Sequence, residues 1–179
     1  MDIIQPIFST IDVSPSSYRN PLYDPTSASA VNWHEIAFVD SQIDNYQSLI
    51  QGFNPNIQVV VLDSHQNGIN QITQFLSSQN YQLSGIHIFS HGHDGSINLG
   101  NTVLNQGNLG IYQSSLATWG QYLIPEGDLL FYGCNVAAET TGQAFLQNIS
   151  NITGADVAAS DDLTGNQALG GNWTLEYTI

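Results

Sequence analysis

The chain has 179 residues, enough for one domain with a substantial core, and its 41% hydrophobic and 10% aromatic content argues against global disorder. Fifteen acidic residues face a single basic one, Arg19, so the formal net charge is −14. This balance excludes a basic patch that could neutralise nucleic-acid phosphates or anionic lipids, so we expect no nucleic-acid binding.

The first 32 residues read as an extended arm or pro-segment. Pro6, Pro15, Pro21 and Pro25 interrupt a stretch rich in Ser and Asn, which is typical of irregular backbone. Arg19 lies in this arm. We therefore divide the chain into an arm, 1–32, and one folded domain, 33–179.

From residue 33 onward, short apolar runs alternate with helical periodicity. The runs predict strands at 35–40, 58–63, 85–90 and 128–133, with two more at 155–160 and 173–178. Four helices are predicted between them, on the apolar faces Ile43/Tyr46/Leu49/Ile50, Ile69/Ile72/Phe75/Leu76, Leu109/Tyr112/Leu116/Trp119/Leu123 and Ala144/Phe145/Ile149.

This alternation indicates βαβ units and an α/β fold with a mostly parallel sheet and helices on both faces. The segment 92–107 breaks the pattern and predicts a small hairpin after the third strand. In open α/β sheets the functional crevice lies at the carboxyl ends of the strands. His91 and Cys134 each follow such an end, so they can meet although they are distant in sequence.

Cys134 and His91 are the residue types of a nucleophile and its base. Gly92 follows the histidine, and the amides of Gly92 and Cys134 are candidates for an oxyanion hole. Spacing alone leaves a second interpretation open, a buried apolar thiol and an unrelated loop histidine. As the chain's only cysteine, Cys134 has no disulfide partner within it and cannot form a multi-cysteine zinc site.

The apolar strands followed by Ser90-His91-Gly92 and by Gly133-Cys134 resemble the caspase, gingipain and separase superfamily of cysteine peptidases. The stretch from Ile36 to Glu176 resembles more closely a bacterial domain of unknown function, number 4347. The strings that carry this resemblance are FVD, VVLD, SHGHDGSINLG, DLLFYGCNVA, TGADVAASDDLTG and GGNWTLE. The resemblance implies a three-layer caspase-like fold, a His91/Cys134 catalytic dyad and oxyanion binding by the glycine after the histidine.

The lack of arginine outside the arm argues against the Asp specificity of caspases. Relatives that cleave after Arg or Lys use carboxylates in the specificity pocket, and Asp161, Asp162 and Asp94 are the candidates here. A solvated loop role for Asp161 and Asp162 stays open. If the pocket accepts basic residues, self-cleavage at Arg19–Asn20 is a further hypothesis.

The segment His91-Gly92-His93-Asp94 also resembles the metal motif of metallo-β-lactamases. That fold needs later histidines, and all five histidines here lie at or before His93, so we do not favour a zinc enzyme. His87 alternates with Ile86 and Ile88 and is predicted to lie in the core. The reaction requires no cofactor. The acidic excess and calcium-dependent relatives make Ca²⁺ a candidate ligand, at a site the sequence does not place.

The sequence therefore supports two functions of different classes. The first is a cysteine endopeptidase or self-processing module acting on a polypeptide or on its own longer chain, with His93 or Asp94 tuning His91. The second is a non-catalytic caspase-like binding or assembly module of a large surface protein. We expect an extracellular or cell-surface location, reached without an N-terminal signal peptide and without membrane insertion.

Overall fold

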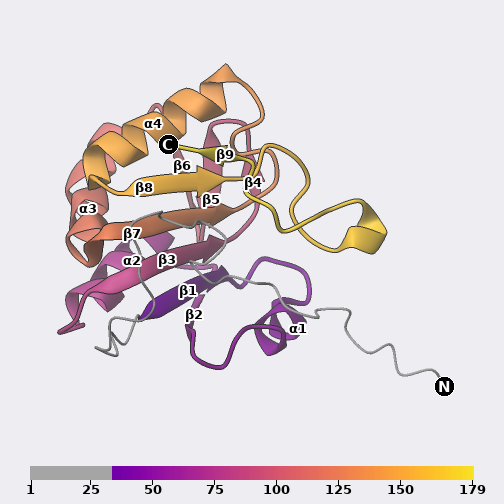
Figure 1. The fold of residues 1–179 in the computed structure, drawn as a ribbon, viewed down its shortest axis with the longest axis horizontal. Helices are drawn as coiled ribbons and strands as arrows, with labels where there is room; N and C mark the ends of the chain where they lie inside the picture. Colours follow the sequence, from indigo (N-terminus) through magenta and orange to yellow (C-terminus); the bar gives the residue numbers. More distant parts are fainter. Residues whose placement is uncertain (1–33) are drawn as a thin grey trace, which may run out of the picture.

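A twisted six-stranded sheet forms the centre of the molecule in the computed structural model, which describes residues 34–179 (Figure 1). The strand order is β2-β1-β3-β7-β8-β9; all neighbouring pairs are parallel except β8 and β9. The strands are β1 (Glu35–Asp40), β2 (Gln58–Leu62), β3 (Leu83–Phe89), β7 (Leu123–Tyr132), β8 (Asp156–Ala159) and β9 (Tyr177–Thr178).

Helices flank both faces of this sheet (Figure 1). The helices are α1 (Tyr46–Gln51), α2 (Gly68–Ser77), α3 (Leu109–Gln121) and α4 (Thr140–Thr153), with a short 3-10 turn, η2, at Gln167–Leu169. Helices α2, α3 and α4 bury their apolar sides on one face, where Trp119, Phe131 and Phe145 are fully enclosed. The shorter α1 places Leu49 on the opposite face, against Phe89 and Tyr132. The predicted α/β class with a mostly parallel sheet is confirmed.

A second, antiparallel sheet follows β3 directly, where the sequence predicted a small hairpin. It consists of β4 (Gly92–His93), β5 (Ser96–Leu99) and β6 (Thr102–Asn105) in the order β4-β5-β6. Gly95 and Gly100 occupy its two turns at φ +70° and +61°, which glycine adopts without strain. Because β4 begins at Gly92, the residue after His91 belongs to this sheet.

Two element predictions were wrong at their ends. Leu123 was assigned to the third helix, but α3 ends at Gln121 and Leu123 opens β7 by pairing with Leu83. The run 173–178 was predicted as a strand, yet only Tyr177–Thr178 pair. Trp173 instead packs its ring 6.0 Å from Phe89, measured between ring centroids, on the face of the sheet. Burial of this large aromatic ring outweighs the β-propensity of the segment.

The predicted arm, 1–32, and its proposed cleavage site at Arg19 lie outside the described residues. Within residues 34–179, no helix is both long and apolar enough to cross a bilayer.

Candidate functional site

His91 and Cys134 follow neighbouring parallel strands at matching positions. Phe89 of β3 is paired with Tyr132 of β7, and each candidate residue lies two positions beyond its member of that pair. The Ser90 amide donates to the Tyr132 carbonyl at 3.2 Å, which continues the pairing past the strand ends. The register therefore brings the two segments, 90–93 and 133–136, to one edge of the sheet, which we call the carboxyl edge.

The two segments of the carboxyl edge touch through their glycines. A Cβ on Gly92 would lie 3.1 Å from the Cys134 carbonyl oxygen and 2.5 Å from Cγ2 of Val136. A Cβ on Gly133 would lie 3.4 Å from the Gly92 Cα. Both positions are buried, and a side chain at residue 92 could not fit without moving Val136. Glycine at positions 92 and 133 is thus explained by the close approach of the two backbone segments that carry His91 and Cys134.

The His91 ring is exposed and contacts a backbone carbonyl. Its Nε2 lies 3.2 Å from the carbonyl oxygen of Gln42, in the loop after β1. A carbonyl only accepts hydrogen bonds, so Nε2 carries a proton in this contact, and a neutral ring that makes it has its lone pair on Nδ1. A neutral imidazole held in one tautomer by a third group is the arrangement that a general base requires.

Asp40, at the end of β1, holds the Gln42 loop in place. Its carboxylate is 1% exposed and accepts from the Gln42 amide at 2.9 Å and from the Gly100 amide at 2.7 Å. The Gln42 side-chain amide also donates to the Gly100 carbonyl at 2.6 Å. Asp40 therefore ties together the small sheet and the loop whose carbonyl contacts His91.

Cys134 is half-buried beneath the loop that follows β8. Its Sγ lies 3.6 Å from the Thr164 carbonyl oxygen, a contact in which the thiol donates. The next residue, Asn135, has φ 58° and donates its amide to the Asp162 carbonyl at 2.7 Å. The Ala137 amide donates to the Ser160 carbonyl at 3.0 Å. The backbone after Cys134 is thus anchored to the end of β8 and to this loop.

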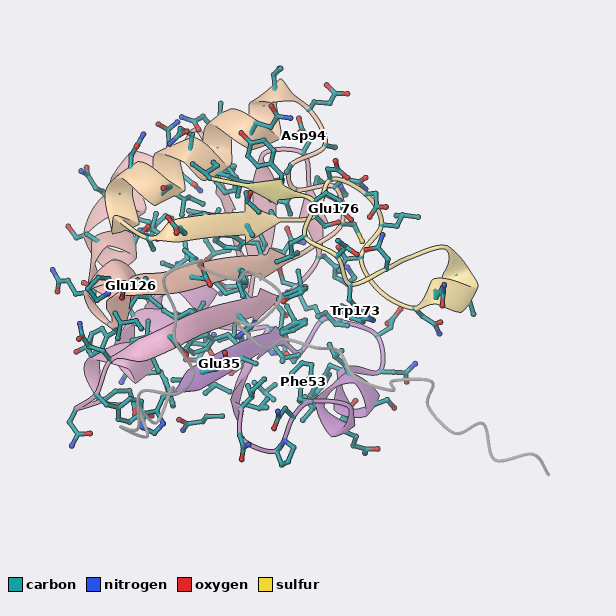
Figure 2. The ribbon with its side chains drawn as sticks, viewed as in Figure 1. Glu35, Phe53, Asp94, Glu126, Trp173 and Glu176 are labelled. Carbon is teal, nitrogen blue, oxygen red and sulfur yellow. The ribbon has the colours of Figure 1, made fainter. Side chains whose placement is uncertain are left out.

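Asp94, a candidate for the specificity pocket, caps helix α4. Its Oδ1 accepts from the amides of Glu139 and Gly142, each at 2.9 Å, at the helix N-terminus, where a carboxylate also suits the helix dipole (Figure 2). The Gly95 amide donates to the Val136 carbonyl at 3.1 Å, beside this cap. Asp94 lies in the turn between β4 and β5, so its hydrogen bonds connect the small sheet to the start of α4, which follows Cys134 in the chain. Its neighbour His93 is exposed.

Asp161 and Asp162 lie in the loop that covers Cys134, where they meet Glu176. The three exposed side chains each offer an oxygen within 4.8 Å of the others. The Asp161 amide donates to Glu176 at 3.2 Å, whereas both Asp162 carboxylate oxygens accept from the Asn172 side chain, at 3.1 and 2.9 Å. The structure therefore places Asp161 and Asp162 together in the loop whose Thr164 contacts Cys134, and it places Asp94 at the N-terminus of α4.

Sequence reasoning missed the groups that contact His91 and Cys134. Gln42 and Thr164 act through backbone carbonyls, and any residue type supplies a carbonyl, so no side-chain pattern marks them. Asp40 had a detectable signal, because an aspartate directly after a buried strand must find hydrogen-bond donors at the sheet edge.

Comparison with family models matches residues 36–179 to the family described as "Domain of unknown function (DUF4347)". The matched part includes the carboxyl edge and the residues that contact it, Asp40, Gln42 and Thr164 among them. No curated protein matches the chain.

Proposed function

Because the chain belongs to the DUF4347 family, a domain whose description leaves its activity open, we propose a function from its own residues. We propose a caspase-like cysteine peptidase or self-processing module in which Cys134 is the nucleophile and His91 the general base. One observation carries the proposal: His91 and Cys134 follow paired strands in matching positions. The Gln42 carbonyl, 3.2 Å from Nε2 of His91, adds support because it favours the tautomer with a free Nδ1.

In this reaction, Nδ1 of His91 takes the thiol proton, and the Cys134 sulfur attacks the carbonyl carbon of the scissile peptide bond. The amides of Gly92 and Cys134 stabilise the resulting oxyanion. Collapse expels the amine, which leaves with the proton from His91, and a thioester remains on Cys134. Water then attacks this thioester and gives a proton to His91; the Cys134 sulfur leaves and takes that proton from His91, so the acid product is released and the thiol and neutral imidazole are restored.

Charge at the site supports a basic residue on the substrate. Residues 34–179 contain no lysine or arginine that could bind an acidic side chain. Asp161, Asp162 and Glu176 lie in and beside the loop over Cys134, so we propose that they attract an Arg or Lys side chain. The oxygen ligands of this exposed group also suit Ca²⁺, which we propose as a bound ion that takes no part in the reaction itself.

A screen of peptide cleavage tests the proposal. The full chain is incubated with a peptide mixture of varied sequence, with and without Ca²⁺, beside Cys134→Ala, and the products are read by mass spectrometry. We expect cleavage after Arg or Lys by the natural protein alone. Intact-mass measurement of the same samples shows whether the chain has also cleaved itself after Arg19. An identical peptide pattern for the two proteins would contradict the peptidase.

A second function, a non-catalytic binding or assembly module, is favoured by one contact. The Cys134 thiol donates to the Thr164 carbonyl at 3.6 Å, so its sulfur is held in a contact with the loop that covers it. A peptidase would have to move the 161–173 loop to free the thiol. Cleavage in the screen above decides between the two functions.

A further inference from the structure

A row of acidic side chains crosses the sheet at its amino end, far from the carboxyl edge. Glu35 of β1 pairs with Gly85 of β3, Gly85 with Asp128 of β7, and Asp128 with Asp156 of β8. Paired residues of neighbouring strands point to the same face and lie about 4.8 Å apart. Glu35, Asp128 and Asp156, which we call the acidic row, therefore share one face, with an empty position at Gly85. Figure 2 labels Glu35 at the start of β1.

His87 leans into this empty position. Its Nε2 lies 3.2 Å from where a Cβ on Gly85 would be and 3.7 Å from Oε2 of Glu35. The ring is 1% exposed, and neither of its nitrogens has a hydrogen-bond partner among residues 34–179. Buried imidazole nitrogens are normally bonded, so an unpartnered pair beside a row of carboxylates indicates a missing ligand. The His87 ring stacks on Tyr132, with 5.9 Å between centroids, which fixes its orientation.

The charges of the acidic row lack a permanent counterion in the described domain. Residues 34–179 contain no lysine or arginine, so only histidine can offer a positive charge there. Like charges gathered on a partly buried surface in this way favour a bound cation.

We propose that Glu35, His87 and Asp128 bind a divalent metal ion above Gly85, with Zn²⁺ as the preferred ion and Asp156 adding negative charge beside it. An imidazole nitrogen with two carboxylates is a ligand set for Zn²⁺, whereas Ca²⁺ takes oxygen ligands alone. Two ligands of a tetrahedral zinc ion lie roughly 3.3 Å apart, given bonds of about 2.0 Å, so the Glu35–His87 pair is already close to this spacing. The proposal requires the Asp128 side chain, which lies beside Gly85 on the neighbouring strand, to rotate toward Gly85 when the ion binds.

The metal would join β1, β3 and β7 at their amino ends and would stabilise the sheet. This site is independent of the proposed peptidase, because it shares no residue with the carboxyl edge.

Zinc titration of the full chain, freed of metal with EDTA, tests the proposal by calorimetry at pH 7.5. Zinc also binds thiolates, so the titration is performed in Cys134→Ser as well as in the natural protein. We expect a site of one ion per chain that persists in Cys134→Ser, with binding at least tenfold weaker in His87→Gln and in Asp128→Asn. His65→Gln and Asp44→Asn, at exposed positions outside both proposed sites, are the matched controls and should bind as the natural protein does. Unchanged binding in His87→Gln and Asp128→Asn, both folded, would overturn the proposal.

Gly85→Ala keeps every proposed ligand and fills the space between them. Its Cβ would lie 3.2 Å from Nε2 of His87 and 3.7 Å from Cγ of Glu35, so the variant should fold and lose the ion. Folding is checked by circular dichroism. A nitrogen NMR spectrum of the imidazoles, with the His87 signals assigned by their loss in His87→Gln, should show them shifting when Zn²⁺ is added but not when Ca²⁺ is added. Equal shifts with the two ions, or full binding by folded Gly85→Ala, would contradict ligation by His87.

Discussion

The two ends of the central sheet differ in whether their buried polar groups have hydrogen-bond partners. At the carboxyl edge, Asp40 is fully buried, yet two backbone amides satisfy it, and Gln42, His91 and Asp94 each have a defined partner. At the amino end, Glu35 lies 3.7 Å from an imidazole whose nitrogens are unbonded, and the burial and charge that surround Asp128 raise its pKa to about 6.

The difference agrees with the two roles that we propose. Satisfied groups hold one geometry, which catalysis by the proposed His91 and Cys134 pair would require. At the amino end, a bound cation or a proton would offset the neighbouring carboxylates and give the buried His87 nitrogens a partner. The predictions below test these two assignments, beginning with the largest expected effect.

Removal of the dyad should abolish the proposed reaction. We expect Cys134→Ala to stop peptide cleavage and His91→Ala to slow it by about 10²–10⁴-fold, the usual contribution of a general base. The measurement is the initial rate of cleavage of the best peptide from the screen. His93→Ala is the control, because His93 is exposed in the same segment, and its rate should stay within about twofold. Cleavage at the natural rate by His91→Ala would remove the catalytic role of the carboxyl edge.

Close contact between the glycines should make the carboxyl edge intolerant of even one methyl group. In Gly92→Ala the new Cβ would meet Val136 at 2.5 Å, so we expect the free energy of unfolding to fall by about 1–3 kcal/mol. Urea unfolding measures this loss. Gly110→Ala in α3 has no neighbour within 4 Å and should be unchanged or slightly more stable. Equal stability of the two variants would mean that the segments are not packed as described.

Loss of the Asp94 cap should affect stability and leave substrate preference unchanged. Asp94→Ala removes the acceptor for the amides of Glu139 and Gly142, and we expect a cost of about 1 kcal/mol in urea unfolding. The cleavage screen, repeated with this variant, should keep the preferred residue of the natural protein. A changed preference with unchanged stability would restore Asp94 as a specificity residue.

Neutralising Asp128 should stabilise the metal-free protein, but only at pH values at which the Asp128 carboxyl of the natural protein has lost its proton. Folding raises the pKa of Asp128 from 3.8 to about 6, through burial and through Asp156 and Glu35, with His87 opposing, so folded protein holds a proton that unfolded protein has released. The natural protein thus loses stability relative to Asp128→Asn as pH rises from about 4 to 6. Solvent screening of this half-buried group limits the gain to about 1 kcal/mol at pH 7.5.

Urea unfolding at pH 4 and pH 7.5, in EDTA, measures this difference. The two proteins should agree at pH 4 and diverge at pH 7.5. A gain of equal size at both pH values would show that the substitution acts through packing and that the acidic row carries no charge strain.

The sequence predicted most of the fold because its periodicities are local. The strands around Phe38, Ile88 and Phe131 and the helix ending before Gly154 all form where expected, since each buries one apolar pattern. The segment after Tyr122 was mistaken because a helix face and a strand start look alike over a few residues. The prediction for 173–178 failed because the Trp173 ring packs across the sheet, a contact that depends on tertiary structure.

The candidate site was predictable only in part. Placement of His91 and Cys134 at the carboxyl ends of strands follows from the alternation of strands and helices, and the resemblance implied that the two strands are neighbours, which the observed register confirms. The Gln42 and Thr164 carbonyls, the capping role of Asp94 and the alignment of Glu35 with Asp128 depend on strand order and register. Those are long-range pairings, and no single segment of sequence contains them.

The reactivity of the Cys134 thiol tests the central claim most directly, since it needs no substrate. The rate of alkylation by iodoacetamide at pH 7, read by intact mass, is compared in the natural protein, His91→Ala and His93→Ala. We predict a rate at least tenfold lower in His91→Ala alone, because His91 is proposed to take the thiol proton. Equal rates in all three folded proteins would contradict a His91–Cys134 dyad and would leave the carboxyl edge as a binding surface.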